Sequence, residues 1–112
     1  MEHAINYHDG VCEIILSGRF DSVAAPLFDV WLDEHDTPET TGYLLNMQEV
    51  PYITSAGLRS ILKLHKRAEE KGGRVALCNV IQAVQDLFKM AGFLTFMNLY
   101  DSRDAALEAL SG

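Results

Sequence analysis

The segment EVPYITSAGLRSILKLHKRAEEKGG, residues 49–73, decides the fold class of this chain. It passes from a strand-like apolar stretch through Thr54 and Ser55 into an amphipathic helical pattern over residues 55–71, which the Gly-Gly pair behind it ends. Serine and threonine commonly cap a helix at its start. A helix start also binds anions, because its first backbone N–H groups are free. Two roles are therefore open for Ser55, a structural cap or a residue that carries a phosphate.

Strand and helix patterns alternate on both sides of this segment. Two strand patterns, residues 4–8 and 11–17, flank Asp9-Gly10, which is a signal for a two-residue hairpin. The remaining patterns are a helix within residues 19–35, a strand at 43–47, a strand at 74–80, a helix at 81–92, a strand at 95–100 and a helix at 101–110. This order predicts a single α/β domain over residues 1–112, with a mixed sheet that starts with the hairpin and about four helices packed against it.

Helical periodicity also predicts which faces are buried. Cys12, Ile14 and Leu16 fall on one face of the second strand. The predicted core residues of the helices are Leu27, Val30 and Trp31 in the first, Leu58, Ile61, Leu62, His65 and Ala68 in the second, and Val84, Leu87, Phe88 and Ala91 in the third. Gly92 is expected to end the third helix, and Ser102 to cap the last one.

Charge is distributed unevenly along the chain. The net charge is -7, yet six of the nine basic residues and two of the sixteen acidic ones lie in residues 58–74, so this segment carries +4 and the remainder -11. A net negative charge argues against nucleic acid as the main partner. Four of the basic residues form one stripe on the predicted solvent side of the long helix: Arg59, Lys63, Lys66 and Arg67. We expect an acidic partner to dock on this stripe.

Several features indicate a cytoplasmic protein. The first ten residues have neither a basic start nor the apolar core of a signal peptide. No apolar run approaches the roughly 20 residues that a membrane span needs, so direct membrane insertion is not expected. Cys12 and Cys78 both lie in apolar strand patterns, which favours buried, reduced thiols.

The residue arrangements that are typical of enzymes are missing from the sequence. The four histidines form no metal-spaced pair with each other or with a cysteine, and the glycine motifs that bind nucleotide phosphates do not occur. Gly-x-Ser-x-Gly is missing too, and no base stands near Ser55 in the sequence. We therefore expect a protein that is not an enzyme, with no catalytic residues, no metal site and no cofactor.

The start of the long helix is the remaining candidate site. Ser55 projects between the apolar and the basic stripe, and Arg59, four residues later, leans back toward it. A phosphate on Ser55 would meet free N–H groups, the positive end of the helix dipole and this guanidinium. Gly57 has no Cβ, so another part of the backbone or a bulky group fits closely against it.

At this point the sequence resembles a known family, the STAS-domain anti-sigma factor antagonists of bacterial partner-switching systems. In this family a strand and an apolar stretch lead to Asp-Ser-Ser-Gly-Leu, which opens a helix. Residues 44–62, LLNMQEVPYITSAGLRSIL, have the same register. Residues 17–28, SGRFDSVAAPLF, resemble the family's Gly-Glu-Leu-Asp segment and the helix with proline behind it. GGRVALCNV (72–80) and VQDLFKMAGF (84–93) resemble a later strand and helix, so the resemblance covers essentially the whole chain.

The resemblance implies a regulatory switch. It places Ser55 at the position that the anti-sigma factor, itself a serine kinase, phosphorylates, and a serine/threonine phosphatase of the metal-dependent class reverses this step. The unphosphorylated form binds the anti-sigma factor and frees the sigma factor. Thr54 stands where aspartate is usual, and is a second candidate acceptor. The expected partner-binding residues are Thr54, Ser55, Ala56, Gly57, Arg59 and Lys63.

Two other functions stay open at this stage. The chain is also compatible with a stand-alone STAS subunit of a membrane transporter, which docks on a cytoplasmic ATPase and has no phosphorylation switch. A small enzyme is the third possibility, although no catalytic set supports it. The identity of the binding partner, a kinase-type anti-sigma factor or a transporter ATPase, separates the first two.

Overall fold

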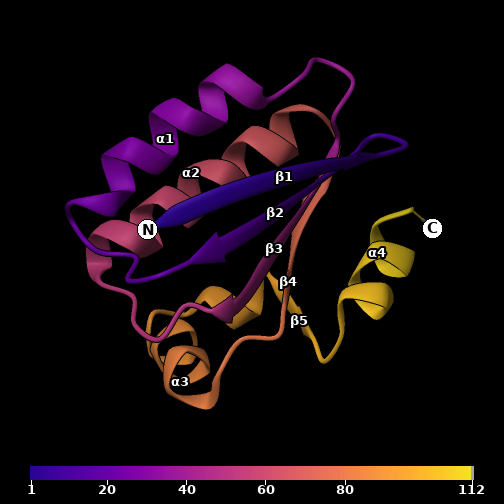
Figure 1. Cartoon of the computed structure of the whole chain (residues 1–112). Coiled ribbons are helices and arrows are strands. Elements are labelled where there is room, and N and C mark those ends of the chain that lie inside the picture. The colour runs from indigo at the N-terminus through magenta and orange to yellow at the C-terminus, as the bar shows by residue number, and fades with distance from the viewer. Residues whose placement is uncertain (112) are drawn as a thin grey trace.

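The chain starts with an antiparallel hairpin in the computed structural model, which describes residues 1–111 (Figure 1). Strands β1 (Glu2–His8) and β2 (Val11–Ser17) pair along their whole length. Asp9 and Gly10 form the turn between them, with φ angles of 39° and 86°. Positive φ at both turn residues is what a two-residue hairpin of this type requires. The hairpin prediction is confirmed.

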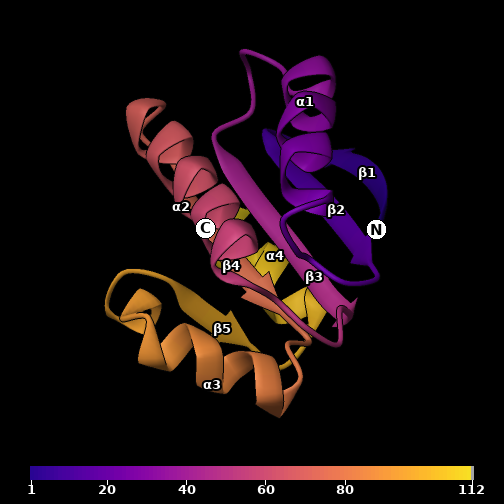
Figure 2. The ribbon, with the colours of Figure 1, turned by 90° about the vertical axis from the view of Figure 1, so that its left-hand side faces the viewer.

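Three further strands continue the sheet parallel to β2, in the order β1-β2-β3-β4-β5. They are β3 (Gly42–Glu49), β4 (Arg74–Cys78) and β5 (Asn98–Tyr100). The helical elements are α1 (Ala24–His35), α2 (Ser55–Glu70), α3 (Gln82–Met90), the short 3-10 helix η1 (Phe93–Thr95) and α4 (Arg103–Ser111). Helices α1 and α2 cover one face of the sheet and α4 covers the other (Figure 1, Figure 2). This is the α/β architecture that the order of elements predicted.

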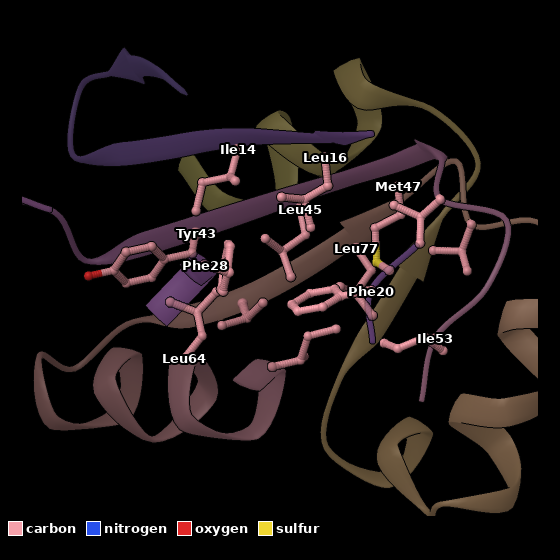
Figure 3. Packing of buried hydrophobic residues seen from close by; sticks show 14 of the residues in the cluster. Ile14, Leu16, Phe20, Phe28, Tyr43, Leu45, Met47, Ile53, Leu64 and Leu77 are labelled. Atoms are coloured by element: carbon pink, nitrogen blue, oxygen red, sulfur yellow. The ribbon is translucent and has the colours of Figure 1, made fainter. Parts of the chain in front are cut away.

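The main core lies between the sheet and helices α1, α2 and α3. Alternate residues of each strand point into it, and Cys12, Ile14 and Leu16 share this face of β2 as predicted. Figure 3 shows Ile14 and Leu16 in this position. Phe20 and Phe28 lie in edge-to-face contact in this core, with ring centroids 5.2 Å apart. A second, smaller cluster lies between the sheet and α4. Because both faces are covered, the central strands are apolar along nearly their whole length.

The core face predicted for α1 is wrong for Leu27 and Val30, whereas Trp31 is partly buried and packs against the core. Leu27 and Val30 are 62% and 57% exposed. The residues of α1 that are buried lie on the opposite side: Ala24, Ala25, Phe28 and Leu32. The sequence of α1 contains two apolar stripes, and periodicity alone does not choose between them. The stripe with the two alanines faces the sheet, where their small side chains let the helix approach closely enough for Phe28 to enter the core.

Helix α2 is turned further toward α1 than predicted. Its buried residues are Gly57, Ser60, Ile61, Leu64 and Ala68. The predicted core residues Leu58, Leu62 and His65 are only partly buried. His65 lies beside Phe96, with ring centroids 4.6 Å apart, so this side of the helix is covered by the segment after α3. Helix α2 is therefore covered on two sides, and its residues on the side toward α1 are the more fully buried.

Helix α3 agrees more closely with its pattern. Val84 and Phe88 are buried as predicted. Ala91 is exposed, because the helix ends one residue before it and the chain turns away. Gly92 adopts a φ of 79°, a left-handed conformation in which glycine commonly ends a helix.

Helix α4 is fastened to the sheet by a buried carboxylate. Glu13 of β2 is fully buried and accepts hydrogen bonds from the guanidinium of Arg103, one of them at 3.0 Å. His8 contacts the same carboxylate at 2.8 Å. The hydrogen bonds from Arg103 hold the pKa of Glu13 below its usual value in spite of its burial. Ser102 caps α4 as predicted, since its Oγ accepts a hydrogen bond from a backbone N–H of the first turn at 3.1 Å.

Candidate functional site at the start of helix α2

Two loops meet at the start of α2, at the carboxyl ends of β2 and β3. The Phe20 N–H donates to the Tyr52 carbonyl at 3.0 Å, and the Thr54 N–H donates to the Phe20 carbonyl at 3.0 Å. Phe20 and Ile53 also form an isolated parallel bridge, and both side chains are buried. These contacts join the loops through their backbones and anchor them in the core. The start of α2 is therefore held in a fixed position.

The first turn of α2 presents free backbone donors. Thr54 is the N-cap residue, and its carbonyl accepts the first hydrogen bond of the helix from Leu58 at 3.0 Å. Within residues 1–111, the N–H groups of Ser55, Ala56 and Gly57 have no hydrogen-bond acceptor, and no side chain caps the helix. Ser55 is exposed, at the helix start where it was expected. Its hydroxyl makes no capping bond, so the structure gives it no role as a cap.

The two neighbouring hydroxyls differ in accessibility. The Oγ1 atom of Thr54 is buried and has no hydrogen-bond partner in the described part of the chain. Ser55, the next residue, is exposed to solvent. Because Thr54 is extended and Ser55 is helical, their side chains leave the backbone in different directions. Only the Ser55 hydroxyl is therefore open to a large partner in this conformation.

Gly57 is required at the start of α2 by the backbone of the neighbouring loop. A Cβ atom at this position would lie 2.5 Å from the Phe20 carbonyl oxygen and 2.7 Å from the Ile53 side chain. The expected close approach to Gly57 is thus confirmed, and the group that approaches is a loop of the same chain. This contact fixes the distance between the two loops of the site.

Replacing Gly57 by alanine should destabilise the protein. The added methyl group forces apart the loop that contains Phe20 and the start of α2, and overpacking of this kind costs about 1–3 kcal/mol. Urea denaturation at 25 °C measures the loss. Ser55→Ala, two residues away on the exposed side, is the control and should unfold like the wild type. A Gly57→Ala variant as stable as that control would contradict the close contact.

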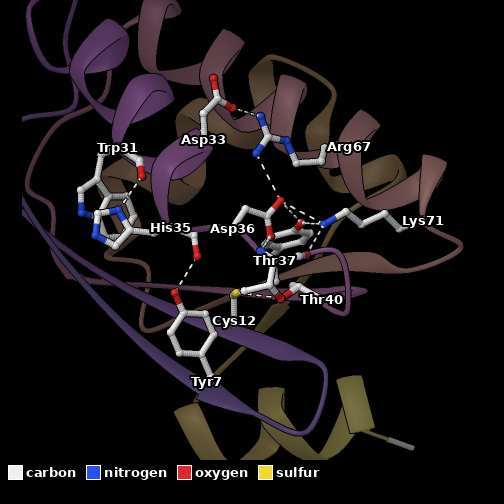
Figure 4. Close-up of polar contacts among 11 residues, drawn as sticks. Tyr7, Cys12, Trp31, Asp33, His35, Asp36, Thr37, Thr40, Arg67 and Lys71 are labelled. Atoms are coloured by element: carbon white, nitrogen blue, oxygen red, sulfur yellow. Dashed lines mark hydrogen bonds and ion pairs between the residues drawn. The ribbon is translucent and has the colours of Figure 1, made fainter.

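The basic stripe on α2 is only partly a free surface. Lys63 pairs with Asp29 of α1 at 3.1 Å. Arg67 pairs with Asp33 and Asp36, as Figure 4 shows. Arg59, Lys63 and Lys66 are exposed on the solvent side as predicted, whereas Arg67 is only partly exposed. Lys63 and Arg67 are engaged because Asp29 and Asp33 of α1, and Asp36 directly after its last residue, lie opposite them. In the described chain Arg59 has no acidic partner, and no hydrogen bond joins it to Ser55. Arg59 is the stripe residue nearest the helix start that stays free to bind a partner.

The carboxylate of Asp36 joins the far ends of α1 and α2. It accepts a hydrogen bond from the Tyr43 hydroxyl at 2.6 Å, from Lys71 at 3.0 Å and from Arg67 at 3.2 Å (Figure 4). Burial alone would raise the pKa of Asp36, but the hydrogen bonds from Tyr43 and Lys71 outweigh it and hold the pKa below its usual value. Together with the ion pairs along the helices, this cluster fixes the orientation of α1 relative to α2.

The sequence pattern missed two residues that shape the surface next to Ser55. The guanidinium of Arg19 lies over the ring of Tyr52, 5.0 Å from its centroid, and Tyr52 remains partly exposed. A hollow of about 290 Å³ also opens between the first turns of α1 and α2. It is lined by Ser22, Pro26, Asp29, Ala56, Arg59 and Lys63. Both features join residues that are far apart in the sequence, so no local pattern in the sequence indicates them.

Neither a metal centre nor a membrane helix is found among residues 1–111. No group of three or more histidine, cysteine, aspartate or glutamate side chains is placed to hold a metal ion there. None of the helices in that range combines the length and the apolar character needed to cross a membrane.

The family model of the STAS domain matches residues 3–106. The chain belongs to the STAS domain family. A curated relative, the anti-sigma F factor antagonist of Paenibacillus polymyxa, is 32% identical over 111 residues, which are 98% of this chain and 92% of the relative. The resemblance found in the sequence is thereby confirmed.

Solved structures of STAS proteins share the fold. The crystal structure of an anti-sigma factor antagonist from Mycobacterium paratuberculosis superposes with a TM-score of 0.87 at 20% identity, covering 99% of this chain and 94% of the other. The Bacillus cell fate determinant SpoIIAA in its phosphorylated form superposes with a TM-score of 0.74 at 17% identity, covering 96% and 99%. At these identities the likeness concerns the architecture alone.

Proposed function

We propose that this STAS domain protein is an anti-sigma factor antagonist that binds an anti-sigma factor of the serine kinase type through the surface around the start of α2. The observation that carries the proposal is the exposed Ser55 at an uncapped helix start, which two loops anchor in the core. The relative from Paenibacillus polymyxa, similar over nearly the whole chain, supports the same class of function. The protein acts in the cytoplasm as a binding protein and has no enzymatic activity of its own.

Phosphorylation of Ser55 is the proposed switch. The phosphate would lie beside the free N–H groups of Ser55, Ala56 and Gly57, where the helix dipole favours negative charge. The fold therefore tolerates the modification. In a protein interface the same phosphate must lose its water, which opposes binding. A phosphatase of the metal-dependent serine/threonine class returns the protein to its binding form.

The burial of the Thr54 hydroxyl favours Ser55 as the acceptor. A kinase must place the γ-phosphate in line with the acceptor oxygen, and the Oγ1 atom of Thr54 is inaccessible without local opening. With the cognate anti-sigma factor and ATP, Thr54→Val should be phosphorylated like the wild type and Ser55→Ala should not be phosphorylated. Phosphopeptide mass spectrometry measures both. Phosphate on Thr54 in the wild type would overturn this assignment.

The transporter-subunit function is the competing proposal, and it makes a different prediction about the partner. Such a subunit binds a transporter ATPase and does not need an exposed acceptor serine. Titration of the purified protein with its cognate anti-sigma factor tests the leading proposal directly, with submicromolar binding as the expected result. No measurable binding to that factor, together with a complex with a transporter ATPase, would replace it.

A further inference from the structure

The solvent face of α1 is apolar. Val23, Leu27 and Val30 are 71%, 62% and 57% exposed, and they follow one another at spacings of four and three residues. Residues at these spacings lie on one side of a helix. Pro26 is also exposed and adjoins the same side. We call these four residues the α1 apolar face.

This face has no counterpart to cover it among residues 1–111. It lies on the side of α1 opposite to the buried residues Phe28 and Leu32. The side of α1 toward α2 carries Asp29 and Asp33, which are paired with basic residues of α2. A surface helix normally places polar residues opposite its core stripe, whereas α1 is apolar on both sides. Contiguous exposed apolar surface on a protein marks a site of interaction.

The α1 apolar face is continuous with the start of α2. Val23 and Leu27 line a surface hollow together with Met1, Arg19 and Asp21. Arg19 in turn lies over the ring of Tyr52, which is two residues before Thr54. On the other side, Pro26 lines the hollow that contains Ala56 and Arg59 of α2. A partner that covers Ser55 therefore also meets the first two turns of α1.

We propose that the α1 apolar face is the affinity-determining part of the surface that binds the anti-sigma factor, with Ser55 at its edge. This inference rests on the proposed function. In this proposal, α1 and the start of α2 have different roles. The apolar contact on α1 supplies binding that does not depend on phosphate, and Ser55 supplies the control. An apolar centre with charged groups around it is the usual construction of a protein interface.

Charge favours a partner protein over a second copy of this chain. The exposed Glu34 lies on the same side of α1 as the apolar face. Among residues 1–111, Glu34 has no ion-pair partner. The whole chain carries a net charge of -7. Two copies packed through α1 would bring like charges together. The complementary surface on a partner carries leucine or another large apolar side chain against the α1 apolar face. It also carries lysine or arginine opposite Glu34, so that it matches this surface in both hydrophobicity and charge.

A double substitution on α1 tests the inference. Leu27→Gln with Val30→Gln removes the apolar groups without adding charge, and both positions are exposed, so the thermal midpoint should stay close to that of the wild type. Isothermal titration with the cognate anti-sigma factor should show about a tenfold rise in Kd. Ala105→Gln is the matched control, because Ala105 is exposed on α4, on the opposite face of the sheet, and it should bind normally. Val23→Gln, which precedes the helix, tests the same surface should the double variant melt early.

Each outcome decides the inference. A wild type that binds and a double variant that binds equally well would overturn the role of α1 and leave the proposed function standing. A wild type that does not bind the factor would remove both. A wild-type dimer in sedimentation velocity that the double variant dissociates would assign the face to a second copy instead. The inference is supported if the double variant binds more weakly and Ala105→Gln binds normally. It also requires that the association rate of Glu34→Gln depends less on salt than that of the wild type.

Discussion

Replacing Phe20 by alanine should lower the free energy of unfolding by about 3–5 kcal/mol, as expected when a fully buried aromatic side chain is removed from a well-packed core. Phe20 is completely buried, contacts Phe28 edge to face, and belongs to the loop that supports the start of α2. Domains of this kind are stable by only about 5–15 kcal/mol, so the variant should unfold at a much lower denaturant concentration. Guanidinium denaturation at 25 °C measures the difference.

Leu27→Ala is the matched control for this experiment. Leu27 is 62% exposed, so its truncation leaves no cavity and should change the free energy of unfolding by less than about 0.5 kcal/mol. The sequence pattern of α1 placed Leu27 in the core, in which case the same truncation would cost about 2–5 kcal/mol. Comparable losses for both variants would show that α1 packs through the opposite face. A large loss for Phe20→Ala alone supports the observed packing.

Phosphorylation of Ser55 should weaken binding to the anti-sigma factor at least a hundredfold while it leaves the fold intact. The phosphate adds nearly two negative charges beside the free N–H groups of α2, where the dipole contributes about 0.3–1 kcal/mol in favour of the folded domain. In the interface, an unpaired buried charge costs several kcal/mol. About 1.4 kcal/mol corresponds to a factor of ten in affinity, so a penalty near 3 kcal/mol accounts for the hundredfold change.

The Ser55 variants make this prediction measurable without the kinase. Ser55→Asp should keep the thermal midpoint and weaken binding at least tenfold, since it carries one charge where phosphoserine carries nearly two. Ser55→Asn has a similar size without the charge, and should bind within about threefold of the wild type, a difference of under 1 kcal/mol. Isothermal titration against the cognate anti-sigma factor provides the affinities. Equal affinities for all three proteins would remove the switch and favour the transporter-subunit function.

The local rules of the chain were enough to place the elements, except that the strand predicted at 95–100 begins only at Asn98, behind the 3-10 helix η1. Asp9-Gly10 predicted the hairpin, because few residue pairs tolerate positive φ at both turn positions. The helical period and the Gly-Gly pair behind it predicted α2 to within one residue of its observed end at Glu70. The position of Ser55 at a helix start follows from the same signals. Each of these features depends on residues that are close together in the sequence. The sequence alone is therefore enough to predict the hairpin, the end of α2 and the position of Ser55.

The faces of the helices, and with them the functional surface, were decided only by the tertiary structure. Helix α1 has two apolar stripes, and the close approach of its alanines to the sheet buries the one that contains Phe28 and leaves Leu27 and Val30 in solvent. Asp29 and Asp33 of α1, with Asp36 directly after it, engage part of the basic stripe of α2, although they are distant from it in the sequence.

The same holds for the buried polar groups. Glu13 was not singled out in the sequence, yet it is fully buried, and Arg103, ninety positions away, reaches it from α4. Thr54 and Ser55 are neighbours with similar hydroxyl groups, and only the packing of one loop against another buries the first and exposes the second. The chain alone determined which residues stand at the start of α2. Contacts between segments far apart in the sequence determined which of them a partner reaches, because burial is a property of the assembled surface and not of any local stretch.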